Sequence, residues 1–442
     1  MRCKSGGRSF FFSVLAGPAL LFGSLLFSTV VFGQGAQAGE DIRDLLLKGK
    51  PVLDLRYRFE FVDQDNLSED AKAHTLRTRA GFETGRFHGL GAGADLEWIE
   101  AIGSDRFNST VNGRTRFPVV ADPDDIALNQ LYFVSDGTIP KTRLKVGRQR
   151  IIWDNARFIG NVGFRQNEQT FDALRVGTTV LPDTDIGYTY LEEVHRIFGR
   201  DSAVGRLEMN SHAVRVQYTG LDFVTVTPFA LLLDYDLASQ DRNSSATLGA
   251  LLEGKYAFRK PWTAHYMASA AHQRDYGGNP VDFGLWYYAV EPGISYDFAK
   301  VSLGYEVLQG DGTQGFRTPL ATGHKFNGFT DRFLTTPANG LQDLYLKLDL
   351  KVPGDDLLSG LSVKGAYHQF WAERGGAHYG SEWDLGVFKT FKTDAGSILL
   401  GLQYADYDAD NFSTDIGKLW LTLQFKLSPK PYRNLVAGRA AD

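Results

Sequence analysis

Apolar and polar side chains alternate with a period of two along most of this chain, in segments of about ten residues. From Val52 to Val62 the odd-numbered positions hold Leu, Leu, Tyr, Phe and Phe. The even-numbered positions hold Asp54, Arg56, Arg58 and Glu60. Successive side chains of a strand point to opposite faces, so this stretch predicts a strand with one apolar and one charged face.

The same alternation recurs along the rest of the chain. Residues 74–84 place Arg77 and Arg79 on the polar face, and residues 90–98 place Asp95 and Glu97 there. The other predicted strands lie near residues 126–135, 141–150, 170–181, 184–195, 211–221, 222–236, 246–258, 263–275, 283–298, 299–309, 341–352, 360–372, 382–392, 396–407 and 415–427. The total is eighteen. Sixteen is the competing count, because strand boundaries are the least certain part of such an analysis.

The connections between the predicted strands alternate in length. Those after even-numbered strands are short, as at 86–89, 182–184, 220–222, 259–261, 298–300 and 393–396. Those after odd-numbered strands are longer, as at 63–73, 101–125, 151–169, 196–210, 237–245 and 310–340. Outer-membrane barrels sort their connections in this way, into short periplasmic turns and longer outer loops. The sequence therefore predicts an all-β fold, a single transmembrane antiparallel β-barrel of about 18 strands.

The N-terminus has the features of a secretory signal. Arg2, Lys4 and Arg8 precede an apolar stretch at 10–32, and Ala36-Gln-Ala38 fits the small-x-small cleavage rule. We expect cleavage near Ala38 and a mature protein in the bacterial outer membrane; an uncleaved anchor is the alternative. The predicted division is a signal peptide at 1–38, a periplasmic lead-in at 39–50, the barrel at 51–428 and a periplasmic tail at 429–442.

Charge and cysteine content narrow the partners. The only cysteine, Cys3, falls in the signal, so the mature chain has no disulfide. Without the three basic residues of the signal, 44 Lys and Arg face 52 Asp and Glu. A net acidic chain is a poor nucleic-acid binder. The expected partners are outer-membrane lipid and lipopolysaccharide, an anionic polysaccharide or small-molecule solute, and periplasmic secretion proteins; no cofactor is expected.

The polar faces of the first three strands suggest rows of charge across the lumen. If strands one and two pair about the centre of their loop, Arg58 faces Arg79 and Glu60 faces Arg77. If strands two and three pair about Phe87, Arg79 faces Asp95 and Arg77 faces Glu97. The rows either stabilise a polar wall or filter ions. Further inward positions are basic, with one counter-charge: Lys145, Arg175, Arg215, Lys347, Lys364 and Asp349.

The connection at 148–167 is rich in arginines and aromatics. Its candidate residues are Arg148, Arg150, Trp153, Asp154, Asn155, Arg157, Phe158, Phe164, Arg165 and Asn167. Guanidinium groups beside aromatic faces suit planar or anionic groups. We expect this loop to fold into the mouth of the barrel and narrow it; a solvated surface loop is the alternative.

The connection at 310–340 is the longest. Loops of more than about fifteen residues are usually functional or disordered, and the apolar content of this one argues against disorder. Its candidate residues are Arg317, His324, Lys325, Asp331 and Arg332.

At these two connections the chain resembles the alginate export family of outer-membrane porins. The residues that carry the resemblance are Gly147-Arg-Gln-Arg150, Trp153, Phe171-Asp-Ala173, Thr318 to Asn327, Asp331, Phe333 and 340–345. The resemblance extends over nearly the whole mature chain. It implies an 18-stranded barrel with an arginine-rich conduit for an anionic polysaccharide.

The function we expect is a passive channel without catalytic residues. Inward arginines would draw anions past the 148–167 loop, and carboxylates such as Asp95, Glu97 and Asp349 would keep the affinity low. The alternative is uptake of small apolar or aromatic solutes, suggested by aromatics such as Trp153 and Phe158. A membrane enzyme is a third possibility. No close pair of histidines suggests zinc, and the segment 406–411 lacks the glycine and glutamate of a calcium loop.

Overall fold

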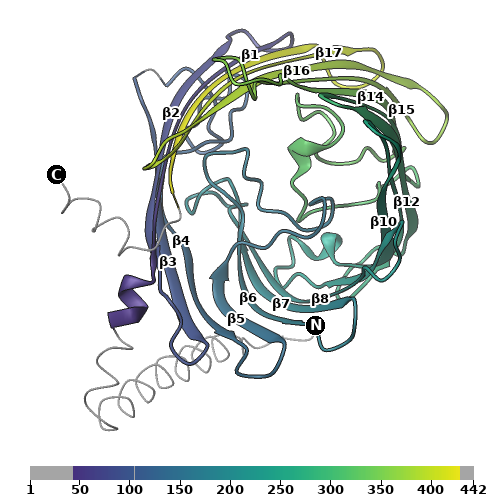
Figure 1. Ribbon diagram of the computed structural model, residues 1–442. Helices are drawn as coiled ribbons and strands as arrows, with labels where there is room; N and C mark the ends of the chain where they lie inside the picture. Colours follow the sequence, from purple (N-terminus) through teal and green to yellow (C-terminus); the bar gives the residue numbers. More distant parts are fainter. Residues whose placement is uncertain (1–42, 104, 429–442) are drawn as a thin grey trace.

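The computed structural model describes residues 43–103 and 105–428, and within them eighteen antiparallel strands close into one barrel (Figure 1). The strands are β1 (Lys50–Gln64), β2 (Ala71–Glu83), β3 (Leu90–Ala101), β4 (Asp125–Asp136), β5 (Thr142–Gln149), β6 (Thr170–Thr178), β7 (Thr184–His195), β8 (Arg206–Tyr218), β9 (Thr225–Leu233), β10 (Ser245–Arg259), β11 (Trp262–Asp275), β12 (Gly284–Tyr296), β13 (Ala299–Leu308), β14 (Leu341–Lys351), β15 (Ser362–Trp371), β16 (His378–Lys392), β17 (Gly396–Ala409) and β18 (Ile416–Leu427). Pairing of β1 with β18 closes the barrel. The predicted barrel and its count of eighteen are confirmed.

The two faces of the strands differ as the alternation predicts. On β3, Leu96 and Trp98 are 56% and 49% exposed on the outside, whereas Asp95 and Glu97 are 5% and 2% exposed inside. Closure pairs every strand on both edges, which removes the unpaired backbone groups that a membrane would penalise. Within the described residues, no helix is long and apolar enough to cross a membrane. The predicted signal, the first four residues of the lead-in and the C-terminal tail fall outside the described residues.

Three long connections turn into the barrel instead of extending from it (Figure 1). They are residues 102–124, residues 150–169, which we call the constriction loop, and residues 309–340, which we call the long loop. They bury residues such as Phe107, Ile159 and Phe316 in one apolar cluster with lumen-facing wall residues such as Tyr287 and Phe370. The constriction loop folds inward as predicted. The long loop, expected on the outer side, also lies in the lumen.

The predicted register of the first three strands is wrong. Arg56 lies opposite Arg77 and Asp54 opposite Arg79, so the β1–β2 pairing is displaced by four residues from the predicted one. The cause is that β2 begins at Ala71, earlier than the expected position 74, which moves the centre of the hairpin.

The β2–β3 pairing is displaced as well. Arg79 lies opposite Glu97, and Arg77 lies opposite Ile99. The turn is centred on His88 and Gly89, which both have positive φ, rather than on Phe87. The predicted rows Glu60–Arg77–Glu97 and Arg58–Arg79–Asp95 therefore do not form, although all six side chains face the lumen.

Candidate functional site

The ends of the constriction loop are joined on the outer face of the barrel. Arg148 donates from Nε and Nη2 to the two carboxylate oxygens of Asp172, at 2.8 and 2.9 Å. Both residues lie on the face of β5 and β6 that carries Val146 and Leu174, which points away from the lumen. His195 also contacts Asp172, at 2.9 Å, and lies near Glu193. The placement of Arg148 on the solute path is therefore wrong: it closes the base of the loop from outside.

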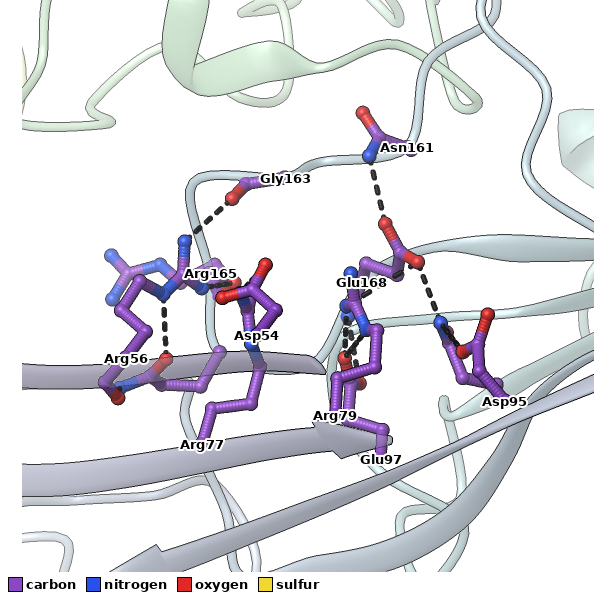
Figure 2. A network of polar contacts seen from close by, with 12 residues as sticks. Asp54, Arg56, Arg77, Arg79, Asp95, Glu97, Asn161, Gly163, Arg165 and Glu168 are labelled. Carbon is purple, nitrogen blue, oxygen red and sulfur yellow. Dashed lines mark hydrogen bonds and ion pairs between the residues drawn. The ribbon is translucent and has the colours of Figure 1, made fainter. Parts of the chain in front are cut away.

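Arg56 holds the constriction loop against the wall. Its Nη1 donates to the carbonyl of Gly163 at 2.9 Å, its Nε to Gln166 Oε1 at 2.8 Å, and its Nη2 to the carbonyl of Arg165 (Figure 2). These bonds satisfy its donors inside the protein. Arg56 therefore positions the loop, and the like charge of Arg77 directly opposite is balanced by Asp54 at 2.8 Å.

Arg165 connects the constriction loop to the wall and to the long loop. Its Nη1 lies 2.9 Å from Glu60 on β1, and its Nη2 lies 3.4 Å from Asp331 of the long loop. Asp122 of the 102–124 loop lies 3.7 Å away. The Arg165 side chain is only 7% exposed, so three separate segments share one buried cation.

Glu168 is a second junction. It accepts from Arg79, Arg150, Asn129 and Asn161, which come from the wall and from the loop itself (Figure 2). Burial alone would raise the pKa of Glu168, but the guanidinium groups of Arg79 and Arg150 lower it to about 2. The carboxylate is therefore ionised at neutral pH. Glu168 is not among the predicted residues because it lies in a loop, where strand parity gives no information.

Arg157 anchors the far side of the loop. Its Nη2 lies 3.0 Å from Glu306 on β13 and 3.1 Å from Asn327 Oδ1 of the long loop. Nearby, Phe158 packs on Phe229 with ring centroids 4.5 Å apart, and Trp153 is 5% exposed. These aromatics fill the space between loop and wall, so the loop is not a solvated surface loop.

Phe164 is the centre of an aromatic stack. The Arg58 guanidinium lies 4.1 Å from its ring centroid, the His324 ring stacks on it at 3.6 Å, and Trp420 of β18 meets it edge-on at 5.7 Å. Cation–π contacts of this kind stabilise by about 0.5–2 kcal/mol. The stack joins β1, the constriction loop, the long loop and β18.

The long-loop candidates all contact neighbouring segments. His324 stacks on Phe164 of the constriction loop, and Asp331 pairs with Arg165. Lys325 donates to the carbonyl of Asn155 at 2.9 Å. Arg317 donates to Asn243 at 2.8 Å, and Arg332 to Ser413 at 3.1 Å, both toward the rim.

The remaining predicted residues lie at several points of the lumen. Three of them form ion pairs: Arg215 with Asp154 at 2.6 Å, Lys347 with Glu291 at 3.3 Å and Lys364 with Asp349 at 3.8 Å. Asn167 donates to the carbonyl of Pro123 at 3.3 Å, and Asp95 accepts from Asn129 and Gln130. The Lys145 ammonium lies 3.5 Å from the ring centroid of Tyr132, and Arg175 on β6 lies opposite Lys145. Most predicted cations therefore have an acidic partner.

A cavity of about 1040 Å³ lies beneath the constriction loop, at the end of the barrel with the short turns. Its basic lining residues are Arg56, Arg77, Arg79, Arg143, Lys145, Arg150, Lys392 and Lys426, and its acidic ones are Asp54, Glu83, Asp95 and Glu168. The bases outnumber the acids by two to one in a chain that is acidic overall. Arg143 and Lys426 are not among the predicted residues, although Arg143 shares the inward parity of Lys145 and Lys426 lies opposite the inward-facing Asp54 of β1.

Comparison with known proteins identifies the barrel. Residues 52–384 match the sequence model of the alginate export family. The chain belongs to the alginate export family. No curated protein matches it.

Members of a second group of solved porins share the fold. OpdK of Pseudomonas aeruginosa, solved with vanillate, is 15% identical with a TM-score of 0.67, and the alignment covers 87% of this chain and 99% of that one. OccAB4 of Acinetobacter baumannii is also 15% identical, with a TM-score of 0.68 and the same coverage. Identities this low show a shared fold. This alginate export family member is thus an outer-membrane barrel channel, whose short-turn end is the periplasmic one.

Proposed function

We propose that this protein is an anion-preferring channel of the Gram-negative outer membrane. The observation that carries the proposal is the basic cavity on the periplasmic side of the constriction loop. A low-dielectric cavity lined mainly by one sign of charge concentrates ions of the opposite sign. The carboxylates among its lining residues keep binding weak enough for a solute to leave.

The bases that contact solute in this proposal are those at the open end. The side chains of Arg143 and Lys426 are 57% and 59% exposed, and the carboxylates nearest to them, Asp136 and Asp54, are 3.2 and 4.0 Å away. Lys145 contacts the face of Tyr132. By contrast, Arg56, Arg157 and Arg165 are engaged by the loops, so they shape the passage and do not bind the solute.

Uptake of apolar solutes has less support. Trp153 and Phe158, which suggested it, are packed between the constriction loop and β9–β11, around a pocket of only about 10 Å³. Vanillate, which is named with the OpdK structure, is an anion, and an anion fits the basic cavity described above. Nothing in this arrangement supports catalysis.

Removing three of the cations that line the cavity should lower the anion preference. We expect the triple variant Arg143→Gln, Lys145→Gln, Lys426→Gln to shift the reversal potential in a KCl gradient toward the cation side, because the cavity then holds nearly equal numbers of bases and acids. The measurement is made on the purified barrel in planar bilayers.

A matched variant removes the same charge elsewhere. Arg106, Arg114 and Arg200 have side chains 50%, 38% and 58% exposed in loops at the opposite end. Their triple replacement by Gln should change the reversal potential much less. A wild-type channel that prefers potassium, or equal shifts in both variants, would refute the proposal.

A further inference from the structure

The constriction loop and the long loop are bonded to each other through their backbones. Gly160 N donates to the carbonyl of Leu320 at 2.8 Å, and Thr322 N donates to that of Ala156 at 3.1 Å. The Thr322 hydroxyl accepts from Val162 N at 3.1 Å. Together the two loops form a single unit, which we call the plug.

The plug is fastened to the wall on different sides of the barrel. Arg165 pairs with Glu60 on β1, and Arg157 pairs with Glu306 on β13. Thr330 donates from its backbone N and from its hydroxyl to Glu382 on β16, at 2.7 and 2.6 Å. All these side chains are buried. Asp154 of the constriction loop also pairs with Arg215 on β8 at 2.6 Å. The anchors therefore extend from β8 through β13 and β16 to β1, and no single hinge lets the plug swing aside (Figure 1).

An apolar core fills the space between these anchors. Ile151 and Ile159 of the constriction loop and Phe316 and Leu320 of the long loop have no exposed surface, and they pack with wall residues such as Phe370. Moving the plug would expose this core and leave buried carboxylates without their cations, and both effects oppose opening.

We infer that the plug stays closed during transport, so that the anions this channel passes are small molecules and not a polysaccharide chain. The inference rests on the proposed anion channel. A chain with a charge on every residue needs an open polar path along its whole length. Along β1 and β2 the plug lies close against the wall, where Arg56, Arg58 and Arg77 are only 5%, 3% and 2% exposed. A solute that passes beside the fixed plug must therefore be small.

A reversible cross-link tests whether the two loops of the plug must separate for transport; movement of the plug as a unit is tested by the anchor variant in the next paragraph. A Cβ on Gly160 would meet the Thr322 side chain directly, so the double variant Gly160→Cys, Thr322→Cys places two thiols together. No cysteine of the predicted mature chain competes. We expect glucuronate flux into liposomes to be equal in the oxidised and the reduced protein. Loss of flux on oxidation, with recovery on reduction, would overturn the inference. The single variant Thr322→Cys controls for the oxidant.

A series of solute sizes provides the second measurement. Wild-type protein should pass glucuronate and a uronate dimer, and it should exclude a uronate octamer. The variant Arg157→Ala, Glu382→Ala, which lacks the anchors on β13 and β16, should admit longer oligomers. Octamer flux through the wild type, or no glucuronate flux at all, would refute the size limit. The chloride-over-potassium preference is measured separately, so the anion channel can stand while the size limit fails.

Discussion

Replacing Arg165 with alanine should increase the single-channel conductance several-fold and destabilise the protein by about 3–5 kcal/mol. Arg165 lies between Glu60 on β1, Asp122 and Asp331. Without the guanidinium, these buried carboxylates repel one another and have lost the cation they shared. Because they belong to the wall and two inward loops, the repulsion separates the plug from the wall. Conductance in planar bilayers and urea unfolding of the folded barrel measure the two effects.

Arg148 supplies the matched control. It belongs to the same basic segment and also makes a carboxylate pair, but with Asp172 on the outer face, where its side chain is 23% exposed. We expect Arg148→Ala to destabilise the protein less than Arg165→Ala, because Asp172 keeps His195 as a partner at 2.9 Å, and to leave conductance unchanged. Equal effects of the two substitutions would show that the inward position of Arg165 has no special role.

The contrast between these two arginines shows what the sequence could predict. Alternation identified all eighteen strands and the inward faces of β1 to β3, because the side-chain period of a strand is fixed at two. The same parity that places Lys145 inside also places Arg148 outside, three positions later. Arg148 was predicted on the solute path because it begins the arginine-rich loop, although strand parity assigns it to the outer face.

Register and partners could not be predicted in the same way. A hairpin register depends on where the turn is centred, and the start of β2 at Ala71 instead of position 74 moved every charge opposite β1. The partners of the plug lie far apart in sequence: Arg165 meets Glu60 across 105 positions, and Arg157 meets Glu306 across 149. Such contacts follow from how three loops pack in one lumen, which no local pattern encodes.

Acidification should loosen the plug through His324. The ring stacks between Phe164 and Phe329, at 3.6 and 5.1 Å. Burial lowers the pKa of His324 below its ordinary value; Asp331 raises it, and the nearby cations Arg165 and Lys418 lower it further. The folded protein therefore binds the proton less readily than the unfolded chain, whose histidine titrates near pH 6.5. The stabilisation by neutral His324 is complete above about pH 6.5 and is lost as the pH falls toward the lowered pKa.

We expect conductance to rise, and unfolding to need less urea, between about pH 7 and pH 5 in the wild type. The substitution His324→Gln should remove most of this dependence, because glutamine carries no proton in that range. Asp331, the partner of His324, titrates in a different pH range. Burial would raise the pKa of Asp331, but His324 and Lys418 lower it below its ordinary value. The stabilisation that ionised Asp331 contributes is therefore lost only below about pH 3.8, outside the range of pH 5 to 7. An identical pH profile in His324→Gln would assign the effect to another group. A profile that flattens only in that variant would show that the stack of Arg58, Phe164 and His324 holds the plug closed at neutral pH.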